Sequence, residues 1–402
     1  MLSQGVVDGI LVPQEIPSRK TVVQTLVSDP AKLEGVNPFA PVFGVNSARV
    51  VAKMCVGLTS ASASQASPAA AQSATAAEQA KAGAADAPAP EGGATQTTAE
   101  NRPSVESPEG ATATEQPRTP LIGVVLRPCE SRALVELAKL QQVSLDPFLI
   151  IGVDCWGTYS IQDYAEKAGK NANGSSVTAE FLQQAQAGKV PAELRNACRV
   201  CQYPTPACAD VAVHLFGEDI TRQVSVHALS EKGKQVFGAL GLQVTQESSG
   251  RENAVTSLRA ARKQTAADDN LNFLETIATL CINCRNCRAV CPICYCRQCV
   301  FDGRVFEYTM DKYLNWSGKK GMLRMPPDKL LFHLTRMSHV SASCVACGQC
   351  EAACPSGIPL GRFYQRVSSA VQEALGYQAG RSIDDELPLT TFRDDELSAV
   401  ED

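Results

Sequence analysis

The stretch "LIGVVLRPCESRALVELAKLQQVSLDPFLIIGVDCWG", residues 121–157, decides the fold of the first part of the chain. It opens with a short continuous apolar run, residues 121–126, as in a buried strand. Apolar residues then recur at helical spacing, at Ala133, Leu134, Leu137 and Leu140. The run "PFLIIGVD" follows as a second buried strand. A strand, a helix and a strand in this order predict a parallel βαβ unit.

The flanking segments extend this unit. Residues 1–57 alternate short apolar runs ("GVVDGILVP", "TVVQTLV", "ARVVAKMCVG") with Pro, Gly, Asn and Asp, which indicates further α/β elements. "VAVHLFG" (211–217) is typical of another strand, and residues 180–188 and 257–280 of helices. We therefore predict an α/β fold class, with a parallel-sheet domain built from residues 1–57 and 120–265.

Two segments lack the composition of a packed domain. Residues 58–119 consist largely of Ala, Ser, Thr, Pro and Glu and contain no aromatic residue, so we expect a disordered insertion that serves as a linker. Residues 381–402 form an acidic tail, for which we expect a solvated, mobile end; such blocks sometimes dock partners.

Composition limits the function classes. The chain has 402 residues and a net charge of −5, with no long basic run, so we expect no nucleic-acid partner. No stretch approaches the roughly 18–20 apolar residues that a membrane span needs, and "MLSQGVVDGILVPQEIPSRK" lacks the features of a signal peptide. We expect a cytoplasmic protein without direct membrane insertion. Seventeen cysteines, an odd number, then favour metal ligation over disulfides.

Two cysteine motifs repeat the spacing C-x2-C-x2-C-x3-C-P, which is the bacterial two-cluster ferredoxin signature. They are Cys281, Cys284, Cys287 and Cys291 before Pro292, and Cys344, Cys347, Cys350 and Cys354 before Pro355. Three cysteines in each motif wrap one 4Fe–4S cubane, while the fourth serves the other. Cluster one is therefore assigned to Cys281, Cys284, Cys287 and Cys354, and cluster two to Cys344, Cys347, Cys350 and Cys291. A zinc site is the alternative, but it usually has two cysteine pairs separated by a longer loop. We predict a mainly α, ferredoxin-type domain over residues 266–380.

Three further cysteines follow the first motif within "CINCRNCRAVCPICYCRQC" (281–299). Cys294, Cys296 and Cys299 have the spacing C-x-C-x2-C and are one ligand short of a cubane. Cys208 is a plausible fourth ligand. Either a fourth cluster or a set of buried thiols explains them.

Another cysteine group belongs to the predicted sheet. Cys129 follows "LIGVVL" and Cys155 follows "FLIIG", so both are expected at the carboxyl ends of parallel strands, where open α/β sheets bind ligands. Cys198 and Cys201 form "CRVC". Spacing alone leaves open whether these four hold a cluster or are small buried hydrophobes.

Five segments in order carry a resemblance to a known family: "GVVDGILVP", "LIGVVLRPCESRALVELAKL", "LIIGVDCWGTY", "CRVCQYP" and the two ferredoxin motifs. Together they resemble the beta subunits of coenzyme F-420 (deazaflavin)-reducing hydrogenases and formate dehydrogenases, in particular the formate dehydrogenase type with a C-terminal dicluster module. The resemblance covers most of the chain outside residues 58–119 and the acidic tail. It implies a third 4Fe–4S cluster, beside FAD, at Cys129, Cys155, Cys198 and Cys201.

The flavin pocket of that family also uses a Gly-Gly-rich stretch, of the form "GGVVTALL", before the segment matching "GVVDGILVP". The sequence begins at that point, so we expect part of the pocket to be missing or to come from another chain. Arg127 and Glu130 flank Cys129. They either help to bind a cluster or an anionic cofactor, or form a surface ion pair.

The resemblance implies an electron-transfer subunit of a multi-subunit oxidoreductase rather than a catalytic chain. A molybdenum or tungsten formate dehydrogenase subunit would oxidise formate, and this chain would pass electrons to an acceptor such as a heterodisulfide-reductase-like flavoprotein. The alternatives are an FAD-containing subunit that reduces deazaflavin or another two-electron carrier, an electron-transfer subunit of a hydrogenase complex, and a scaffold whose clusters are structural.

Overall fold

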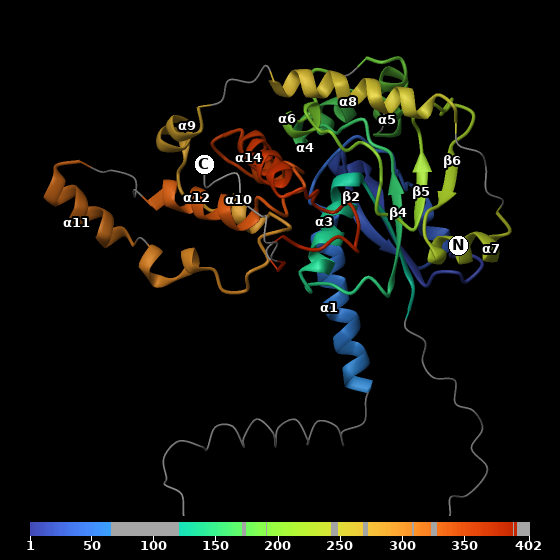
Figure 1. The fold of residues 1–402 in the computed structure, drawn as a ribbon, viewed down its shortest axis with the longest axis horizontal. Coiled ribbons are helices and arrows are strands. Elements are labelled where there is room, and N and C mark those ends of the chain that lie inside the picture. Colours follow the sequence, from blue (N-terminus) through green and yellow to red (C-terminus); the bar gives the residue numbers. More distant parts are fainter. Residues whose placement is uncertain are drawn as a thin grey trace, which may run out of the picture. The chain divides into compact units, whose positions relative to one another are not determined.

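A six-stranded sheet organises the first part of the chain (Figure 1). The computed structural model describes residues 1–65, 120–170, 174–189, 191–242, 248–267, 272–307, 309–322, 328–388 and 390–391. The strand order is β2-β1-β3-β4-β5-β6. The strands are β1 Gly9–Ile16, β2 Thr21–Val27, β3 Ile122–Leu126, β4 Phe148–Val153, β5 Val211–His214 and β6 Ser225–Ala228.

The central pairs of the sheet are parallel, and both edge pairs are antiparallel. Strands β1 and β3, β3 and β4, and β4 and β5 run parallel, with Val124 opposite Ile150 in the middle pair. Strands β2 and β6 pair antiparallel with their neighbours. The α/β class is confirmed, and the predicted parallel sheet is present in its central strands, whereas the two edge pairs are antiparallel. A tight connection over residues 17–20 joins β1 to β2, and so short a link permits only a hairpin.

The predicted βαβ unit is present. Helix α3 (Pro128–Lys139) connects β3 to β4, and its predicted apolar face is buried at Ala133, Leu134 and Leu137. Pro128 stands in the first turn, where its missing N–H costs nothing. The other helices of this part are α4 (Ile161–Lys170), α5 (Gly174–Gln186), α6 (Asn196–Arg199), α7 (Glu231–Leu240) and α8 (Arg251–Ala267).

The part of the chain after α8 is mainly helical, as predicted. Its helices are α9 (Phe273–Leu280), α10 (Asn286–Ala289), α11 (Met310–Lys320), α12 (Asp328–Val340), α13 (Gln349–Ala352) and α14 (Leu360–Ala374). Ile277, Phe332 and Phe363 form the centre of its apolar core, and cysteines of both ferredoxin motifs pack against them. The core of this region is therefore assembled around its thiols.

Helix α3 connects the sheet to the C-terminal part through buried polar groups. Arg132 Nε donates to the Ala379 carbonyl at 2.8 Å, and Arg132 Nη1 donates to the Val345 carbonyl at 3.4 Å. Glu136 Oε1 accepts from the Gly380 amide at 2.7 Å. Buried charges of this kind are tolerated only when hydrogen-bonded, so these contacts specify one arrangement of α3 against the C-terminal part.

The proposed insertion is only partly described. Helix α1 (Ser47–Gln65) extends past residue 57, and residues 66–119 lie outside the described residues, as do residues 392–402 of the acidic tail. Among the described helices, none combines the length and the apolar composition needed to cross a membrane.

Candidate metal centres

The four cysteines predicted near the sheet line one small cavity. Cys129 is in the first turn of α3, after β3, and Cys155 lies just after β4. Short helix α6 carries Cys198 and ends just before Cys201. All four border a cavity of about 30 Å³, and Cys347 of the second ferredoxin motif borders it as well. We call this set the sheet group: Cys129, Cys155, Cys198 and Cys201.

Gly157 allows the two halves of the sheet group to approach. Its φ is +119°, and a Cβ there would lie 2.8 Å from Leu194 Cδ1 and 3.3 Å from Cys198 Cβ. Any other residue would push the segment carrying Cys198 away from Cys155, and it would also be strained by this φ. The glycine is thus required by both the backbone conformation and the close packing.

Arginines surround the sheet group. Arg262 of α8 donates to the Trp156 carbonyl at 2.6 Å and to the Cys201 carbonyl at 3.1 Å. Arg195 donates to the Cys347 carbonyl at 2.8 Å, and its Nη1 lies 3.9 Å from Cys198 Sγ. Guanidinium groups at these positions offset negative charge that would build up on the thiolates.

The cysteines of the sheet group are partly buried, and all four line the same small cavity. Burial raises the pKa of Cys129 well above its ordinary value, and Glu130, Cys347, Cys155 and Cys201 raise it further. Burial also raises the pKa of Cys155 to about 11, against the opposing effect of Arg127. The Gly157 amide donates to Cys155 Sγ, and the Tyr203 amide to Cys201 Sγ, each at 3.4 Å. A metal centre would supply the positive charge needed to ionise such a set, so these residues fit a thiolate-ligated cluster.

The two ferredoxin motifs fold into matching loops. Asn283 and Arg285 in the first have φ of 57° and 61°, and the corresponding Ala346 and Gly348 in the second have 55° and 67°. Each loop continues into one helical turn, α10 or α13, at the same offset of 63 residues. Successive backbone N–H groups in such conformations point inward and form anion-binding concavities. The two motifs thus share their backbone conformation as well as their cysteine spacing.

The thiols assigned to cluster one lie near one another. Burial raises the pKa of Cys281, and Cys284 and Cys354 raise it further. Burial raises the pKa of Cys287 to about 11, with Cys281, Cys284 and Cys354 contributing in the same direction and Arg336 opposing them. Cys354 comes from the other motif, so this arrangement matches the exchange of the fourth ligand expected from sequence.

The thiols assigned to cluster two show the reciprocal exchange. Burial raises the pKa of Cys344, of Cys347 (to about 12) and of Cys350, and Cys291 of the first motif acts on all three in the same direction. All three are partly buried, whereas Cys284 of the first motif is exposed to solvent. The two sets therefore differ in their access to solvent.

The additional cysteines have different surroundings. Cys294 and Cys299 pack against the apolar core of the C-terminal part, and Cys296 is exposed. Cys208 makes a different contact, against the Gly380 carbonyl at 2.9 Å. The structure thus does not place Cys208 with Cys294 as a ligand pair.

Arg127 and Glu130 make a buried ion pair rather than a surface one. Their Nη1 and Oε2 atoms are 3.7 Å apart, and the Glu130 side chain is 1% exposed. Glu130 Oε1 accepts from the Ser47 amide at 3.0 Å and from the Ser47 hydroxyl at 2.6 Å, which fixes the start of α1. The positive charge of Arg127 also opposes the rise in the pKa of Cys155 that burial causes. The pair thus orients two helix starts and places one cation beside the sheet group.

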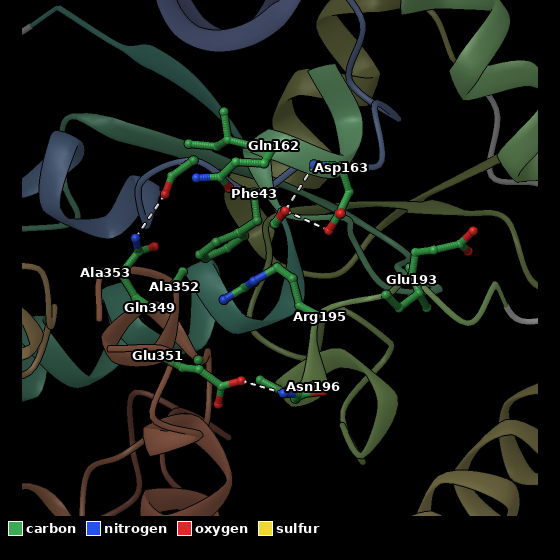
Figure 2. A pocket seen from close by; sticks show the side chains of 17 residues that line it. Phe43, Gln162, Asp163, Glu193, Arg195, Asn196, Gln349, Glu351, Ala352 and Ala353 are labelled. Atoms are coloured by element: carbon green, nitrogen blue, oxygen red, sulfur yellow. Dashed lines mark hydrogen bonds between the residues drawn. The ribbon is translucent and has the colours of Figure 1, made fainter. Parts of the chain in front are cut away.

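A larger cavity of about 410 Å³ lies beside these centres, lined by residues of the sheet part and of the second ferredoxin loop (Figure 2). Figure 2 shows Arg195 beside the Phe43 ring, whose centroid is 4.2 Å from the guanidinium carbon. Asn196 donates to Glu351 across the cavity at 2.7 Å. Within the described ranges, no three His, Cys, Asp or Glu side chains converge on a single-ion site.

Sequence reasoning missed the cations and the histidine around the thiols. Arg195 stands three residues before Cys198, so its position next to the "CRVC" motif was a usable signal. His333, whose Nε2 is 3.4 Å from Cys281 Sγ, and Arg336 belong to α12, more than 40 residues after the first motif. Nothing local in the sequence connects α12 with the cysteines.

Comparison with known proteins confirms the expected resemblance. Residues 120–247 match the family described as coenzyme F420 hydrogenase/dehydrogenase, C terminus of the beta subunit. The matched segment contains β3 to β6 and the whole sheet group. This part of the chain is thus similar to the C-terminal part of hydrogenase/dehydrogenase beta subunits.

Two particular relatives are beta subunits of formate dehydrogenases. The F420-dependent formate dehydrogenase subunit beta of Methanocaldococcus jannaschii is 28% identical over 305 residues, which are 66% of this chain and 75% of that protein. The F420-dependent formate dehydrogenase 1 subunit beta of Methanococcus maripaludis is 28% identical over 311 residues, 66% of this chain and 74% of that protein. A chain in a xenon-derivatised F420-reducing [NiFe] hydrogenase complex from Methanosarcina barkeri gives a TM-score of 0.37 at 10% identity, covering 70% of this chain and 84% of that one.

Proposed function

We propose that this chain is an iron–sulfur electron-transfer subunit of a multi-subunit oxidoreductase of the formate dehydrogenase type. It would carry three 4Fe–4S clusters: one in the sheet group, and clusters one and two in the ferredoxin loops. One observation carries the proposal. Cys347, a cluster-two ligand, lines the same cavity as the sheet group, so the two centres would be neighbours and electrons could pass between them.

The order of the centres follows from the shared thiols. Cys291 and Cys354 exchange between the two loops, which makes cluster one the neighbour of cluster two. Cluster two in turn borders the sheet group through Cys347. The route would therefore run from cluster one, through cluster two, to the sheet group. Formate oxidised by a molybdenum or tungsten subunit would supply the electrons, and a heterodisulfide-reductase-like flavoprotein would be one acceptor.

Iron and sulfide analysis tests this proposal. The full chain, purified and reconstituted without oxygen, should hold about twelve irons and as many sulfides, and dithionite should reduce the clusters to paramagnetic states. Four irons or fewer would eliminate the paired clusters, and a content near sixteen would restore a fourth cluster at Cys294, Cys296 and Cys299. A spectrum unchanged by dithionite would favour a structural role. Mass spectrometry of the native complex would identify the catalytic partner.

The 410 Å³ cavity favours a second candidate, a subunit that also holds FAD. Its volume falls within the range of small-molecule sites, and its lining includes neighbours of Cys198 and Cys347, such as Ala197 and Gly348. Arg195 on its wall would supply a cation for the diphosphate of FAD, and Glu193 and Glu351 would accept hydrogen bonds from flavin or sugar donors. Acid extraction should release flavin from the native complex, and Ile161→Trp, which fills the cavity, should abolish it. A complex without flavin would remove this candidate.

A further inference from the structure

His333 of α12 lies beside a cysteine assigned to cluster one. Its Nε2 atom is 3.4 Å from Cys281 Sγ, which is within hydrogen-bond distance for sulfur. The contact is enclosed, since His333 is 1% exposed and Cys281 is 8% exposed. Among the described residues, no other cysteine of the two ferredoxin motifs has a histidine within hydrogen-bond distance. This contact therefore distinguishes cluster one from cluster two.

Two further side chains of α12 hold the helix against the first ferredoxin loop. Lys329 Nζ donates to the Cys281 carbonyl at 3.4 Å, and Lys329 stands one helical turn before His333 on the same face of α12. The Asn283 side-chain amide donates to the Asp328 carboxylate at 3.4 Å. Three side chains of α12 thus contact the start of the loop, so the approach of His333 to Cys281 is set by the packing of the whole helix end.

Aromatic rings hold the imidazole in this orientation. The Phe273 ring meets it edge to face, with ring centroids 6.2 Å apart, and the Phe332 centroid is 5.0 Å away. The Tyr364 hydroxyl donates to the His333 carbonyl at 3.5 Å. Because cores are closely packed, the ring cannot turn away from Cys281 without displacing these neighbours.

The hydrogen bond has one direction when Cys281 ligates a cluster. A cysteine ligates metal as a thiolate, which has no proton to donate, so the hydrogen of this contact belongs to Nε2 of His333. The other ring nitrogen, Nδ1, is buried without a partner among the described residues, and an N–H there would be unsatisfied. The Asn283 backbone amide donates to the same sulfur at 3.4 Å. Two N–H groups from different segments thus converge on Cys281 Sγ.

We propose that the His333 imidazole donates a hydrogen bond to the Cys281 thiolate and thereby raises the reduction potential of cluster one. The inference rests on the proposed function, since it assumes that cluster one is bound. Reduction adds negative charge to a cluster, and a donor to a ligand sulfur stabilises that charge. His333 acts through Cys281, so it is a positioning residue and not a ligand. The potential at one end of the proposed route would then depend on α12.

Redox titration at one fixed pH, followed by electron paramagnetic resonance, tests the inference on the full, reconstituted chain. His333→Phe keeps an aromatic ring but removes the donor. It should weaken the preference of cluster one for its reduced state about tenfold, a fall of about 59 mV for a one-electron couple. The other potentials should stay unchanged.

Two amide variants separate the hydrogen bond from the packing. The amide nitrogen of His333→Gln reaches the place of Nε2 and should keep most of the wild-type potential. The shorter His333→Asn does not reach it and should behave like His333→Phe. His339→Phe is the matched control, at an exposed position of the same helix, and should leave every potential unchanged.

Each outcome discriminates. Unshifted potentials in His333→Phe and His333→Asn, with iron content intact, overturn this inference and leave the proposed function standing. Loss of about four irons in all three His333 variants would make the imidazole a ligand and overturns it too. If His333→Phe does not fold, the difference between His333→Gln and His333→Asn decides, and equal potentials in these two count against the inference. A wild-type chain without paramagnetic clusters sinks the proposed function, and this inference with it.

Discussion

The two ferredoxin loops share their spacing and backbone but not their surroundings. In the first, Cys284 is exposed and Arg285 extends from the left-handed position. In the second, the equivalent position is Gly348, where a Cβ would lie 2.3 Å from Ala197 Cβ. The first loop thus faces solvent and the second is packed against the sheet part. Equal spacing therefore specifies equal loop conformations, whereas the burial of each loop depends on the segments it contacts.

Chelation gives the largest expected contrast between the loops. Treatment of the reconstituted chain with an oxidant and an iron chelator should remove about four irons in a fast phase, from cluster one, before the rest. The reason is that Cys284 is exposed, whereas the thiols assigned to cluster two are all partly buried. Iron content and paramagnetic signals followed over time measure the phases. A single phase for all irons would show that the loops are equally protected.

Gly348→Ala should strongly destabilise the second loop. The substitution places a Cβ on a residue in the left-handed conformation, and this Cβ also overpacks against Ala197. Together the two effects should lower the free energy of unfolding by about 2–5 kcal/mol. Denaturant unfolding of the chain measures the loss. The matched control is Arg285→Ala at the equivalent position of the first loop, which loses hydrogen bonds to Phe301 and Phe306 but creates no clash. Equal losses in the two variants would contradict the difference in packing.

Arg195→Met should loosen the second loop from the sheet part. It removes the 2.8 Å hydrogen bond to the Cys347 carbonyl and the contact with Phe43, together about 2–3 kcal/mol. Electron transfer from cluster two to the sheet group should slow as well, which rapid-mixing spectroscopy of the reduced chain would detect. Arg195→Lys keeps the charge but not the planar guanidinium group, so its stability and electron-transfer rate should lie between those of the wild type and Arg195→Met. An unchanged free energy of unfolding in Arg195→Met would mean that other contacts hold the second ferredoxin loop against the sheet part.

The smallest expected effect is at an exposed ion pair of the first loop. Arg288 pairs with Asp302, while the equivalent position of the second loop, Glu351, accepts from the Gly361 amide at 3.0 Å. Asp302→Asn should lower the free energy of unfolding by less than about 1 kcal/mol, because solvent screens exposed ion pairs. At high salt the substitution should have no effect, because the ions screen the pair further. Urea midpoints at two salt concentrations measure it. A loss above about 2 kcal/mol would mean that this side of the first loop is also structurally constrained.

Local patterns in the sequence predicted much of this protein. The apolar runs predicted β3, α3, β4 and β5, because buried strands and amphipathic helices have different periods. The repeated cysteine spacing predicted two like loops, and the structure has them with matching left-handed residues. The antiparallel edges β2 and β6 were not predicted, because an apolar run indicates a strand but not its direction in the sheet.

By itself, the sequence determined the cysteine spacings, the βαβ unit and the resemblance to hydrogenase and formate dehydrogenase beta subunits. The packing of distant segments decides that Cys347 lines one cavity with the sheet group. It also decides that buried Arg336 of α12 stacks on Phe332 and Tyr364 in the core against which the ferredoxin cysteines pack. The physical reason is that spacing controls conformation over a few residues. Burial, charge and hydrogen bonding at the thiols are set by segments far away in the sequence, which meet only when the core packs.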